Sequence, residues 1–389
     1  MYSIQFMQIS RFFVLIVFIS SCSLFSGNDK KKDDSCDWPI GNRNYSWRID
    51  TVGYWPSTMG GLYVFNDSTA FLTGNINDKK NNQLAGLRWN GTKWLTDIYN
   101  PAPEYPAGHF GNDAIGDDTL MVSVGYWGLN LDQAAIGEFN LKTKTWTNHK
   151  FEVQGELNSV WTDGKGFYIA VGNNGIMYTK DSQSSDWVFS RMEDEFNLNK
   201  VAGISETEWY ISGYKYPDPR ATVNNKIYRV LNGTITVIYD NYHIDSSILP
   251  LFGSTSTTRI DAIRCCISDS LYLFISGEVQ VKLSSFENEL NFRSINLSKL
   301  SSGINEISHF SGYITAFTPN DVWIPTIWFG LYHYNGIDVK KIESIPSINY
   351  GDTRSDGVLR QVKKSKSGKL WMLMETGSQQ YILIQGTPL

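Results

Sequence analysis

The chain has 389 residues, of which 19% are charged and 41% hydrophobic, and its net charge is −5. This composition can fill a sizeable core and argues against general disorder, while the lack of a basic stripe argues against a nucleic-acid partner. Its 13 Trp, 21 Tyr, 20 Phe and 33 Gly favour many short strands joined by tight turns.

The N-terminus indicates export. Arg11 precedes an apolar run, Phe12–Ser20, which is too short to span a bilayer and has the length of a signal-peptide core. The run ends in Ile19-Ser20-Ser21-Cys22, which resembles the lipobox of bacterial lipoproteins. The resemblance implies that residues 1–21 are removed and that Cys22 carries a diacylglycerol and an acyl chain such as palmitate, enough to hold a protein on a membrane. An ordinary secretory signal with an incidental cysteine is the alternative.

Residues 22–44 are polar and charged without periodicity, which predicts a flexible tether. Within it, Lys32-Asp33-Asp34 resembles the signal that sends some lipoproteins of the Bacteroides lineage to the outer face of the outer membrane. A charge run of this length is also typical of a solvated linker. We therefore expect a lipid-anchored outer-membrane protein, with display at the cell surface as a further expectation.

Three Asn-Gly pairs stand at similar places in similar segments. Asn90-Gly91, Asn232-Gly233 and Asn335-Gly336 each separate two runs of alternating apolar and polar residues, as in "GLRWNGTKWLTDI". Such pairs are typical of hairpins, because both central residues of a type I′ turn need a positive φ. We expect each pair to form the outermost hairpin of a repeated unit.

The strands that follow the outermost turns recur at about 40 to 56 residues, the scale of a propeller blade. Upstream of each is a second strand rich in β-forming residues, which a polar turn usually precedes. These second strands are "AFLTGN", "LMVSVGY", "FYIAVGN", "EWYISGY", "LYLFISG", "DVWIPTI" and "KLWMLME". With inner strands such as "LNSVWTD" before those turns, the unit is a four-stranded antiparallel meander.

Counting these units predicts how the chain ends. Six complete units run from about residue 59 to 345, and a seventh lacks its fourth strand. "YSWRIDTVG", residues 45–53, has the outer-strand pattern but no unit of its own. We predict that it completes the last blade, so that residues 45–389 form an all-β, seven-bladed β-propeller of four-stranded antiparallel blades without exposed end strands. Six or eight blades, a pair of β-sandwiches and a β-solenoid are the alternatives.

Two segments carry a family resemblance. "SVWTDGKGFYIAVGNNGIMYTKDSQSSDW" and "ITAFTPNDVWIPTIWFGLYHYNG" resemble blades of bacterial β-propellers related to photosystem II assembly factors and sialidase-type repeats. "WRIDTVG" resembles the start of propeller lipoproteins in Bacteroides relatives. The resemblance covers about residues 44–386 and implies fold more than activity. Residues 178–187 are similar to an Asp-box, with Asp181 and Trp187, but they lack its Gly and are one residue too long.

The sequence predicts no catalytic, metal or cofactor site. A sialidase needs three arginines around a carboxylate and a Tyr-Glu pair, and no Phe-Arg-Ile-Pro type segment marks one of the isolated arginines as catalytic. The five histidines and the cysteines Cys36, Cys265 and Cys266 lack metal-binding spacing, and no phosphate loop or nucleophile elbow is present. Two carboxylates from different blades that meet at the axis remain a hydrolase alternative.

The loops after the second strands carry aromatic and amide residues, a combination that favours ligand binding. In the predicted ring they open on one face beside the axial funnel, where aromatic rings and amides can stack on sugars or grip an extended peptide. Packing between blades is the alternative for any one of them. The candidate binding residues are Tyr126, Trp127, Asn173, Asn174, Tyr214, Tyr216 and Trp328.

The sequence therefore favours a membrane-anchored binding or scaffold module for a glycan or protein partner. A polysaccharide-directed hydrolase or lyase with its site in the funnel is one alternative, and a structural protein of envelope assembly is another. Converging carboxylates would favour the hydrolase, a flat aromatic face the binding module, and a featureless polar funnel the structural role.

We expect globomycin to leave a larger, uncleaved precursor of this protein in its native host, because the drug blocks cleavage before a lipidated cysteine. Immunoblotting of treated and untreated cells measures the shift, with a non-lipidated secreted protein of the same host as control. Normal processing under the drug would count against lipidation at Cys22.

Overall fold

The computed structural model describes residues 39–96, 109–127, 133–216, 224–240, 260–264, 270–275, 279–286, 289–296, 315–326, 330–342, 358–376 and 380–389. Between residues 260 and 296 it describes the backbone. The predicted signal peptide, Cys22, most of the predicted tether and Trp328 lie outside the described residues. Trp38–Leu389 form one compact unit.

A seven-stranded antiparallel sheet joins the two ends of this unit, in the order β25-β26-β27-β1-β2-β3-β4. Its strands are β1 (Tyr45–Asn66), β2 (Thr69–Asn77), β3 (Gln83–Trp89), β4 (Trp94–Leu95), β25 (Val358–Lys364), β26 (Leu370–Glu375) and β27 (Tyr381–Pro388).

Five four-stranded antiparallel sheets complete the described part. In chain order they are β5 (His109–Gly116), β6 (Leu120–Trp127), β7 (Gln133–Asn140) and β8 (Thr145–Gln154); β9 (Leu157–Thr162), β10 (Tyr168–Gly172), β11 (Ile176–Lys180) and β12 (Val188–Arg191); β13 (Asn197–Ser205), β14 (Glu208–Lys215), β15 (Asn224–Leu231) and β16 (Thr234–Asp240); β17 (Ile260–Arg264), β18 (Ser270–Ile275), β19 (Val279–Phe286) and β20 (Glu289–Asn296); and β21 (Thr315–Thr318), β22 (Asp321–Thr326), β23 (Gly330–Tyr334) and β24 (Val339–Lys341).

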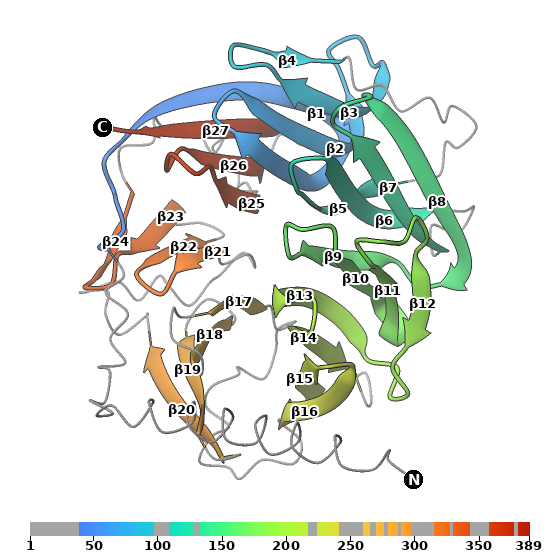
Figure 1. Ribbon diagram of the computed structural model, residues 1–389. Helices are drawn as coiled ribbons and strands as arrows, with labels where there is room; N and C mark the ends of the chain where they lie inside the picture. Colours follow the sequence, from blue (N-terminus) through green and yellow to red (C-terminus); the bar gives the residue numbers. More distant parts are fainter. Residues whose placement is uncertain are drawn as a thin grey trace, which may run out of the picture. The chain divides into compact units, whose positions relative to one another are not determined.

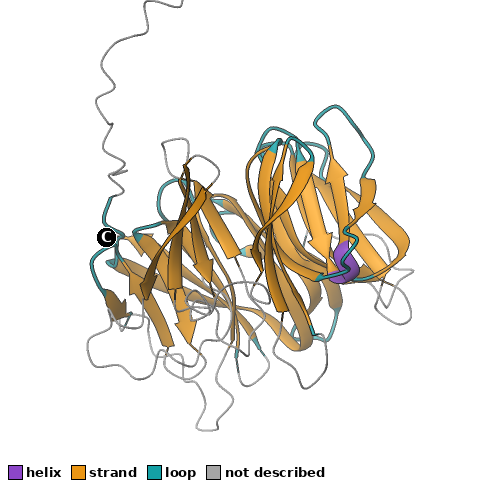
Figure 2. Ribbon diagram, turned by 90° about the horizontal axis from the view of Figure 1, so that it is seen from below, coloured by secondary structure: helices purple, strands orange, loops and turns teal. Residues whose placement is uncertain are grey.

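The sheets are arranged around a common centre (Figure 1). The strands that face this centre are β1, β5, β9, β13, β17, β21 and β25, and each packs against the next, with β25 against β1. A short 3-10 helix, η1 (Asn173–Gly175), follows β10 and is drawn in purple in Figure 2. The described residues contain no helix long and apolar enough to cross a lipid bilayer.

Strand β1 belongs to two ladders. From Tyr45 to Gly53 it pairs with β27, with Tyr45 opposite Pro388 and Gly53 opposite Tyr381. From Tyr54 to Asn66 it pairs with β2. The predicted ladder between the N-terminal strand and the last strand is therefore present, and the predicted four-stranded antiparallel units are present in the other sheets.

The chain before β1 is also held in place. The backbone N–H of Gly41 donates to Asn320 O at 3.1 Å and to Asn335 O at 3.3 Å. The Arg43 guanidinium pairs with the Asp338 carboxylate at 2.6 Å and donates to His333 O at 2.8 Å. These contacts form a clamp, Gly41–Arg43, between the end of the predicted tether and the sheet of β22 and β23.

The predicted hairpins are present, but the expected turn geometry is wrong at two of the three Asn-Gly pairs. At Asn232-Gly233 both residues have positive φ, 49° and 77°. At Asn90-Gly91 and Asn335-Gly336 only the glycine does, with φ of 94° and 95°. There the Asn90 side-chain oxygen accepts hydrogen bonds from the N–H groups of Thr92 and Lys93 at 3.1 and 2.9 Å. The Asn335 side-chain oxygen likewise accepts from the N–H groups of Ile337 and Asp338. The asparagine side chain thus makes an Asx turn, and its own backbone need not be left-handed.

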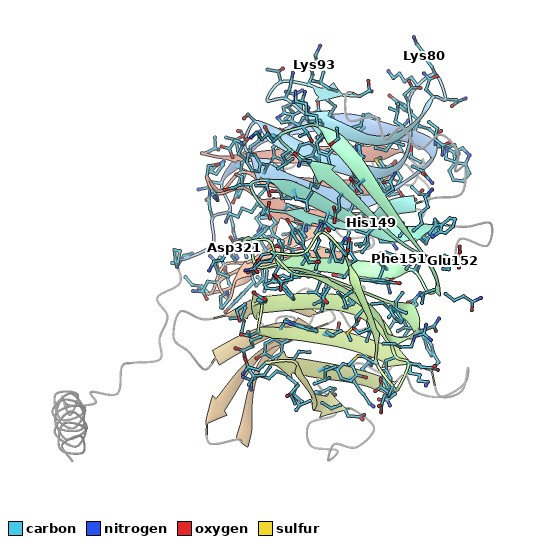
Figure 3. The ribbon with its side chains drawn as sticks, turned by 45° about the vertical axis from the view of Figure 1, so that its right-hand side comes forward. Lys80, Lys93, His149, Phe151, Glu152 and Asp321 are labelled. Atoms are coloured by element: carbon cyan, nitrogen blue, oxygen red, sulfur yellow. The ribbon has the colours of Figure 1, made fainter. Side chains whose placement is uncertain are left out.

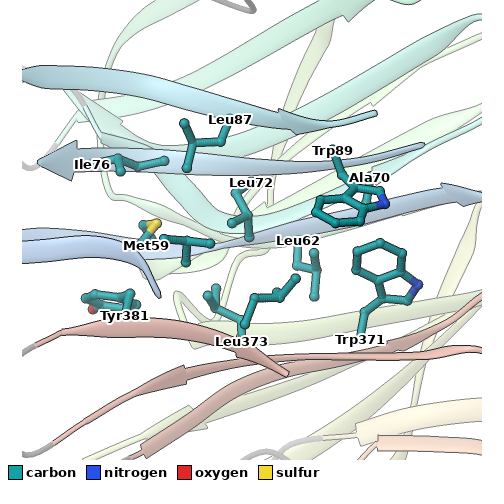
Figure 4. Close-up of a cluster of buried hydrophobic side chains, with 12 residues drawn as sticks. Met59, Leu62, Ala70, Leu72, Ile76, Leu87, Trp89, Trp371, Leu373 and Tyr381 are labelled. Atoms are coloured by element: carbon teal, nitrogen blue, oxygen red, sulfur yellow. The ribbon is translucent and has the colours of Figure 1, made fainter. Parts of the chain in front are cut away.

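Large apolar side chains fill the space between neighbouring sheets. Figure 4 shows one such cluster, in which β1, β2 and β3 meet β26 and β27. Trp89 and Trp371 meet edge to face with ring centroids 5.9 Å apart, and Leu62, Leu72 and Leu373 are fully buried. Each such side chain contributes about 1.5–3 kcal/mol to stability. The two halves of the seven-stranded sheet therefore pack face to face, although they share β1.

Buried carboxylates add polar links between neighbouring sheets. Glu138 on β7 accepts hydrogen bonds from Lys180 Nζ on β11 at 2.6 Å and from Trp187 Nε1, just before β12, at 2.7 Å. Asp321 on β22 pairs with Lys364 on β25. Since buried charges are costly unless they are paired and hydrogen-bonded, these contacts favour one relative placement of the sheets.

We expect Gly386→Ala to lower the free energy of unfolding by about 1–3 kcal/mol, the usual cost of overpacking. Gly386 lies opposite Trp47 in the ladder of β1 and β27, and a Cβ there would stand 2.5 Å from Trp47 Cζ3. Urea denaturation measures the change. Thr387→Ala, on the same strand but exposed, is the matched control, and equal stability of the two variants would contradict the close packing of this seam.

Candidate functional site

A cavity of about 500 Å³ lies among the innermost strands, within the size range of ligand-binding pockets. Residues of β1, β5, β9, β13, β21 and β25 line it, together with the loop residue Glu156, Asn173 of η1, Tyr214 of β14 and Tyr381 of β27. We call it the axial cavity, because the sheets are arranged around it. Half of its lining residues carry amide or charged side chains.

Three asparagines occupy the same position on three successive innermost strands. Asn112 Nδ2 on β5 donates to Leu157 O on β9 at 2.7 Å, and Asn158 Nδ2 on β9 donates to Leu198 O on β13 at 2.9 Å. Asn199 follows Leu198 as Asn158 follows Leu157. Each of the first two therefore binds the backbone just before the next asparagine. The series joins neighbouring sheets and lines the axial cavity with amides.

Asp113, beside Asn112 on β5, is 3% exposed and is the charged centre of this wall. Its Oδ2 accepts a hydrogen bond from Ser159 Oγ at 3.0 Å and lies 3.3 Å from Lys200 Nζ. Its Oδ1 accepts from Gln361 Nε2 at 3.0 Å and lies 3.8 Å from Lys363 Nζ. These partners belong to β9, β13 and β25, so one carboxylate joins four innermost strands.

The charge state of Asp113 follows from these contacts. Burial opposes its ionisation, but the ammonium groups of Lys200 and Lys363 and the Ser159 hydroxyl outweigh burial and hold the pKa of Asp113 at about 2. The carboxylate is therefore charged at neutral pH. Both of its oxygens are already engaged, which leaves it little capacity to accept a proton from a substrate.

Glu156 stands at the edge of the axial cavity in a different environment. Burial raises the pKa of its carboxyl, although hydrogen bonds from Asn173 and Asn112 partly oppose the shift. Asn173 Nδ2 donates to Glu156 Oε1 at 3.3 Å, and Asn173 N donates to Glu156 O at 2.9 Å. Gly172 permits this approach, because a Cβ there would lie 2.0 Å from Glu156 O. Burial, reinforced by the charge of Glu156, also raises the pKa of Tyr126.

Strand β25 contributes two further polar groups. The Arg360 guanidinium binds the Glu375 carboxylate, which also accepts a hydrogen bond from Tyr381 OH at 3.0 Å. Gln361, which donates to Asp113, accepts a hydrogen bond from Leu62 N of β1 at 3.1 Å. The polar network of the cavity thus extends to β1.

Two of the candidate binding residues that the sequence grouped on one face line the axial cavity, and the others do not. Asn173 and Tyr214 line the axial cavity, and Tyr126 is close enough to Glu156 for that charge to shift its pKa. Trp127 lies away from the cavity lining, with Lys150 Nζ 5.5 Å from its ring centroid. Asn174 and Tyr216 are exposed and do not line the cavity either. Trp328 lies outside the described residues.

Sequence reasoning missed most of the cavity wall. Asn112, Asn158 and Asn199 form a visible series in "FGNDAIG", "ELNSVWT" and "NLNKVAG" once the inner strands are aligned. The residue after each asparagine is Asp113, Ser159 or Lys200, and these are the groups that meet at the buried carboxylate. The sequence signal that could have revealed this wall is an Asn repeated at the same position of successive inner strands.

The described part of the axial cavity is better suited to binding than to hydrolysis. Asp113 and Glu156 are the carboxylates among its described lining residues, and Asp113 is saturated by its partners. A two-carboxylate mechanism needs one acid and one base or nucleophile that can both reach the substrate. Among the described residues no cluster of three or more His, Cys, Asp or Glu side chains could hold a metal ion. Amide side chains, which donate and accept together, suit the polar groups of a bound ligand.

Comparisons with known proteins identify the fold. No protein-family profile matches the chain, and no curated protein is significantly similar to it in sequence. The structure of YCF48 bound to a D1 peptide is 12% identical with a TM-score of 0.53, covering 90% of this chain and 98% of that chain. YCF48 from Cyanidioschyzon merolae is 11% identical with a TM-score of 0.52, covering 87% and 98%. The chain thus has a β-propeller fold of repeated sheets, and the resemblance to propellers related to photosystem II assembly factors is confirmed for the fold.

We expect Asp113→Asn to lower the free energy of unfolding by about 3 kcal/mol at pH 7, because the ammonium groups of Lys200 and Lys363 lose their buried partner. The pKa of Asp113 is lower in the folded protein than its ordinary value of 3.8. Its contribution is therefore complete above about pH 5 and is lost as the pH falls towards about 2.

Urea denaturation at pH 7, 5 and 3 measures this effect. The difference in unfolding free energy between wild type and Asp113→Asn should be constant from pH 7 to 5 and smaller at pH 3. Asp118→Asn, an exposed carboxylate in the following turn, should change stability by no more than about 0.5 kcal/mol. A difference that does not depend on pH would contradict the assigned role of Asp113.

Proposed function

We propose that this chain is a seven-bladed β-propeller that serves as a binding or scaffold module for a protein partner. The blade count follows from treating the seven-stranded sheet as two blades that share β1. The first half of β1 belongs to one blade with β25, β26 and β27, and the second half belongs to another with β2, β3 and β4. The five four-stranded sheets supply the others. The contact of β25 with β1 supports closure of the ring.

The observation that carries the binding function is the amide-rich wall of the axial cavity. An extended peptide presents alternating N–H and C=O groups, and asparagine side chains match both because each carries a donor and an acceptor. The cavity lining also includes three aromatic side chains, Tyr214, Phe317 and Tyr381, that can cover the apolar part of such a segment. The similar structure of YCF48 contains a bound D1 peptide, which supports a peptide-binding role for this fold without locating it on this chain.

The membrane-anchored part of the proposal rests on the lipobox-like segment that ends at Cys22. Acylation there would hold the propeller at the outer membrane, and the Lys32-Asp33-Asp34 run supports display at the cell surface. A scaffold in that position would bring its bound partner to the envelope. The alternative structural role in envelope assembly keeps the membrane anchor and the propeller but requires no peptide bound in the cavity.

A polysaccharide-directed hydrolase is the second candidate, and Glu156 is the residue that favours it. Its carboxyl has a raised pKa at the edge of a cavity, as a general acid requires. The second carboxylate of the described lining is Asp113, which its four side-chain partners hold. Binding therefore explains the described geometry with fewer assumptions.

We expect a photo-crosslinking amino acid at position 214 of the full-length protein to capture one linear segment of one envelope protein in the native host. Tyr214 lines the axial cavity, so a crosslink there reports on its occupant, and mass spectrometry identifies the attached peptide. The same amino acid at position 189, on the exposed outer strand β12, is the control. Identical products at both positions, or none at position 214, would refute peptide capture in the cavity.

A further inference from the structure

A second pocket of about 500 Å³ lies apart from the axial cavity and shares no lining residue with it. It is lined by Tyr54, Trp55, Asp78, Lys79, Asn81 and Gln380. Tyr54 and Trp55 lie in β1 where its two ladders meet, and Asp78, Lys79 and Asn81 belong to the turn after β2. We call it the Trp55 pocket.

The exposure of Trp55 is the first unusual feature. Its side chain is 62% exposed, more than that of any other tryptophan among the described residues. Trp89, Trp323 and Trp371 are at most 1% exposed. An aromatic ring this size usually gains stability by burial. A tryptophan held at the surface beside polar groups is typical of a recognition site.

The bend that carries Trp55 is locked by hydrogen bonds. Ser57, 4% exposed, donates through Oγ to Tyr54 O at 2.5 Å, and Asn77 N donates to Ser57 Oγ at 2.8 Å. One buried hydroxyl thus connects the bend to β2. The ring of Trp55 is therefore presented from a fixed backbone, which lowers the entropic cost of binding a ligand against it.

The opposite wall is equally well ordered. Asp78 Oδ1 accepts from Lys80 N at 2.7 Å and from Asn82 N at 2.9 Å, and Asp78 Oδ2 accepts from Asn82 Nδ2 at 2.8 Å. These bonds, led by the one from the Asn82 side chain, lower the pKa of Asp78. Asn81 takes the left-handed conformation, φ 60°, at the tip of the turn. Lys80, on the same turn, points away from the body of the molecule (Figure 3).

Gln380 completes the pocket from the loop before β27. Its backbone is fixed by Thr376, whose N–H donates to Gln380 O at 2.8 Å and whose Oγ1 accepts from Gln380 N at 3.2 Å. The amides of Asn81 and Gln380 thus belong to two different, internally braced turns. Lys79 Nζ lies 5.8 Å from the Tyr54 ring centroid, which brings an ammonium donor to the same pocket.

We propose that the Trp55 pocket binds a neutral pyranose unit of a glycan. A sugar ring has one face of C–H groups, which suits the flat, exposed indole, and a rim of hydroxyls that both donate and accept hydrogen bonds. The side-chain amides of Asn81 and Gln380 can also both donate and accept hydrogen bonds. Asp78 and Lys79 balance in charge, so the pocket has no net charge to select an ionic ligand.

An extended peptide fits this pocket less well. Peptides that add to a sheet need an unpaired strand edge, whereas Tyr54 of β1 is already paired with Asn77 of β2. The pocket offers one aromatic platform and side-chain amides, and its main chain is occupied by the bonds described above. This site is independent of the peptide-binding role proposed for the axial cavity.

The test is a binding titration of the full-length protein in detergent against cellotetraose, xylotetraose, mannotriose and laminaritriose. A decaproline peptide is titrated separately to represent extended peptides, the alternative class of ligand. We expect at least one oligosaccharide to bind and its affinity to fall tenfold or more in Trp55→Ala. Trp55→Phe should retain part of the affinity, because a flat ring remains. Phe189→Ala, which removes an exposed ring from the distant strand β12, should bind as wild type.

Thermal unfolding monitored by circular dichroism shows whether Trp55→Ala keeps the wild-type fold, as the exposure of the ring predicts. If that variant unfolds, Asn81→Ala replaces it, since that side chain is also exposed. Binding of decaproline but no sugar, binding of none of the panel, or sugar affinity unchanged in the pocket variants would each overturn the proposal. Retained sugar binding in Tyr214→Ala would separate this site from the axial cavity.

Discussion

The contact on which this structure most depends is the buried carboxylate of Asp113. It meets groups from β9, β13 and β25 while standing on β5, and Gln361 carries the connection to β1. Apolar packing alone gives neighbouring sheets an attraction without a fixed register. A buried charge that must keep its partners selects one arrangement, because any shift of a sheet leaves an ammonium or a carboxylate unpaired at a cost of several kcal/mol.

The need to pair buried polar groups also explains why polar side chains gather at the centre of the molecule. Sheets that twist around an axis bring their inner strands close together, and the residues facing the axis must then satisfy one another or bind a ligand. Asn112 and Asn158 satisfy the next strand, since each side-chain amide donates to one of its backbone carbonyls, and both also line the cavity. The side chains that join the innermost strands are therefore also the ones that a ligand of the axial cavity would meet, whereas the Trp55 pocket is braced by bonds of its own.

Local patterns in the sequence predicted the strands, the hairpins and the ladder between the termini, because alternation and turn residues act over a few positions. Of the cavity wall they predicted Asn173 and Tyr214 but not the series on the innermost strands. Asn112 and Asn158 bind backbone carbonyls 45 and 40 residues further along the chain, and nothing near them in sequence marks those partners. The expected left-handed Asn at two turns failed because the side-chain oxygen competes successfully for the backbone N–H groups. The exposure of Trp55 depends on a bond from Ser57 that no periodicity reveals.

The clamp at Gly41 and Arg43 has a mechanical consequence. A pulling force applied to the N-terminal end of the chain reaches Arg43 before it reaches β1, so the first bonds loaded are those to Asp338, His333 and Asn320. These belong to the sheet of β21–β24, not to the seam of β1 and β27 that joins the two termini. Drag on the propeller in flowing liquid would thus be carried by an ion pair and a few carbonyl contacts, and the terminal ladder would bear load only after they had yielded.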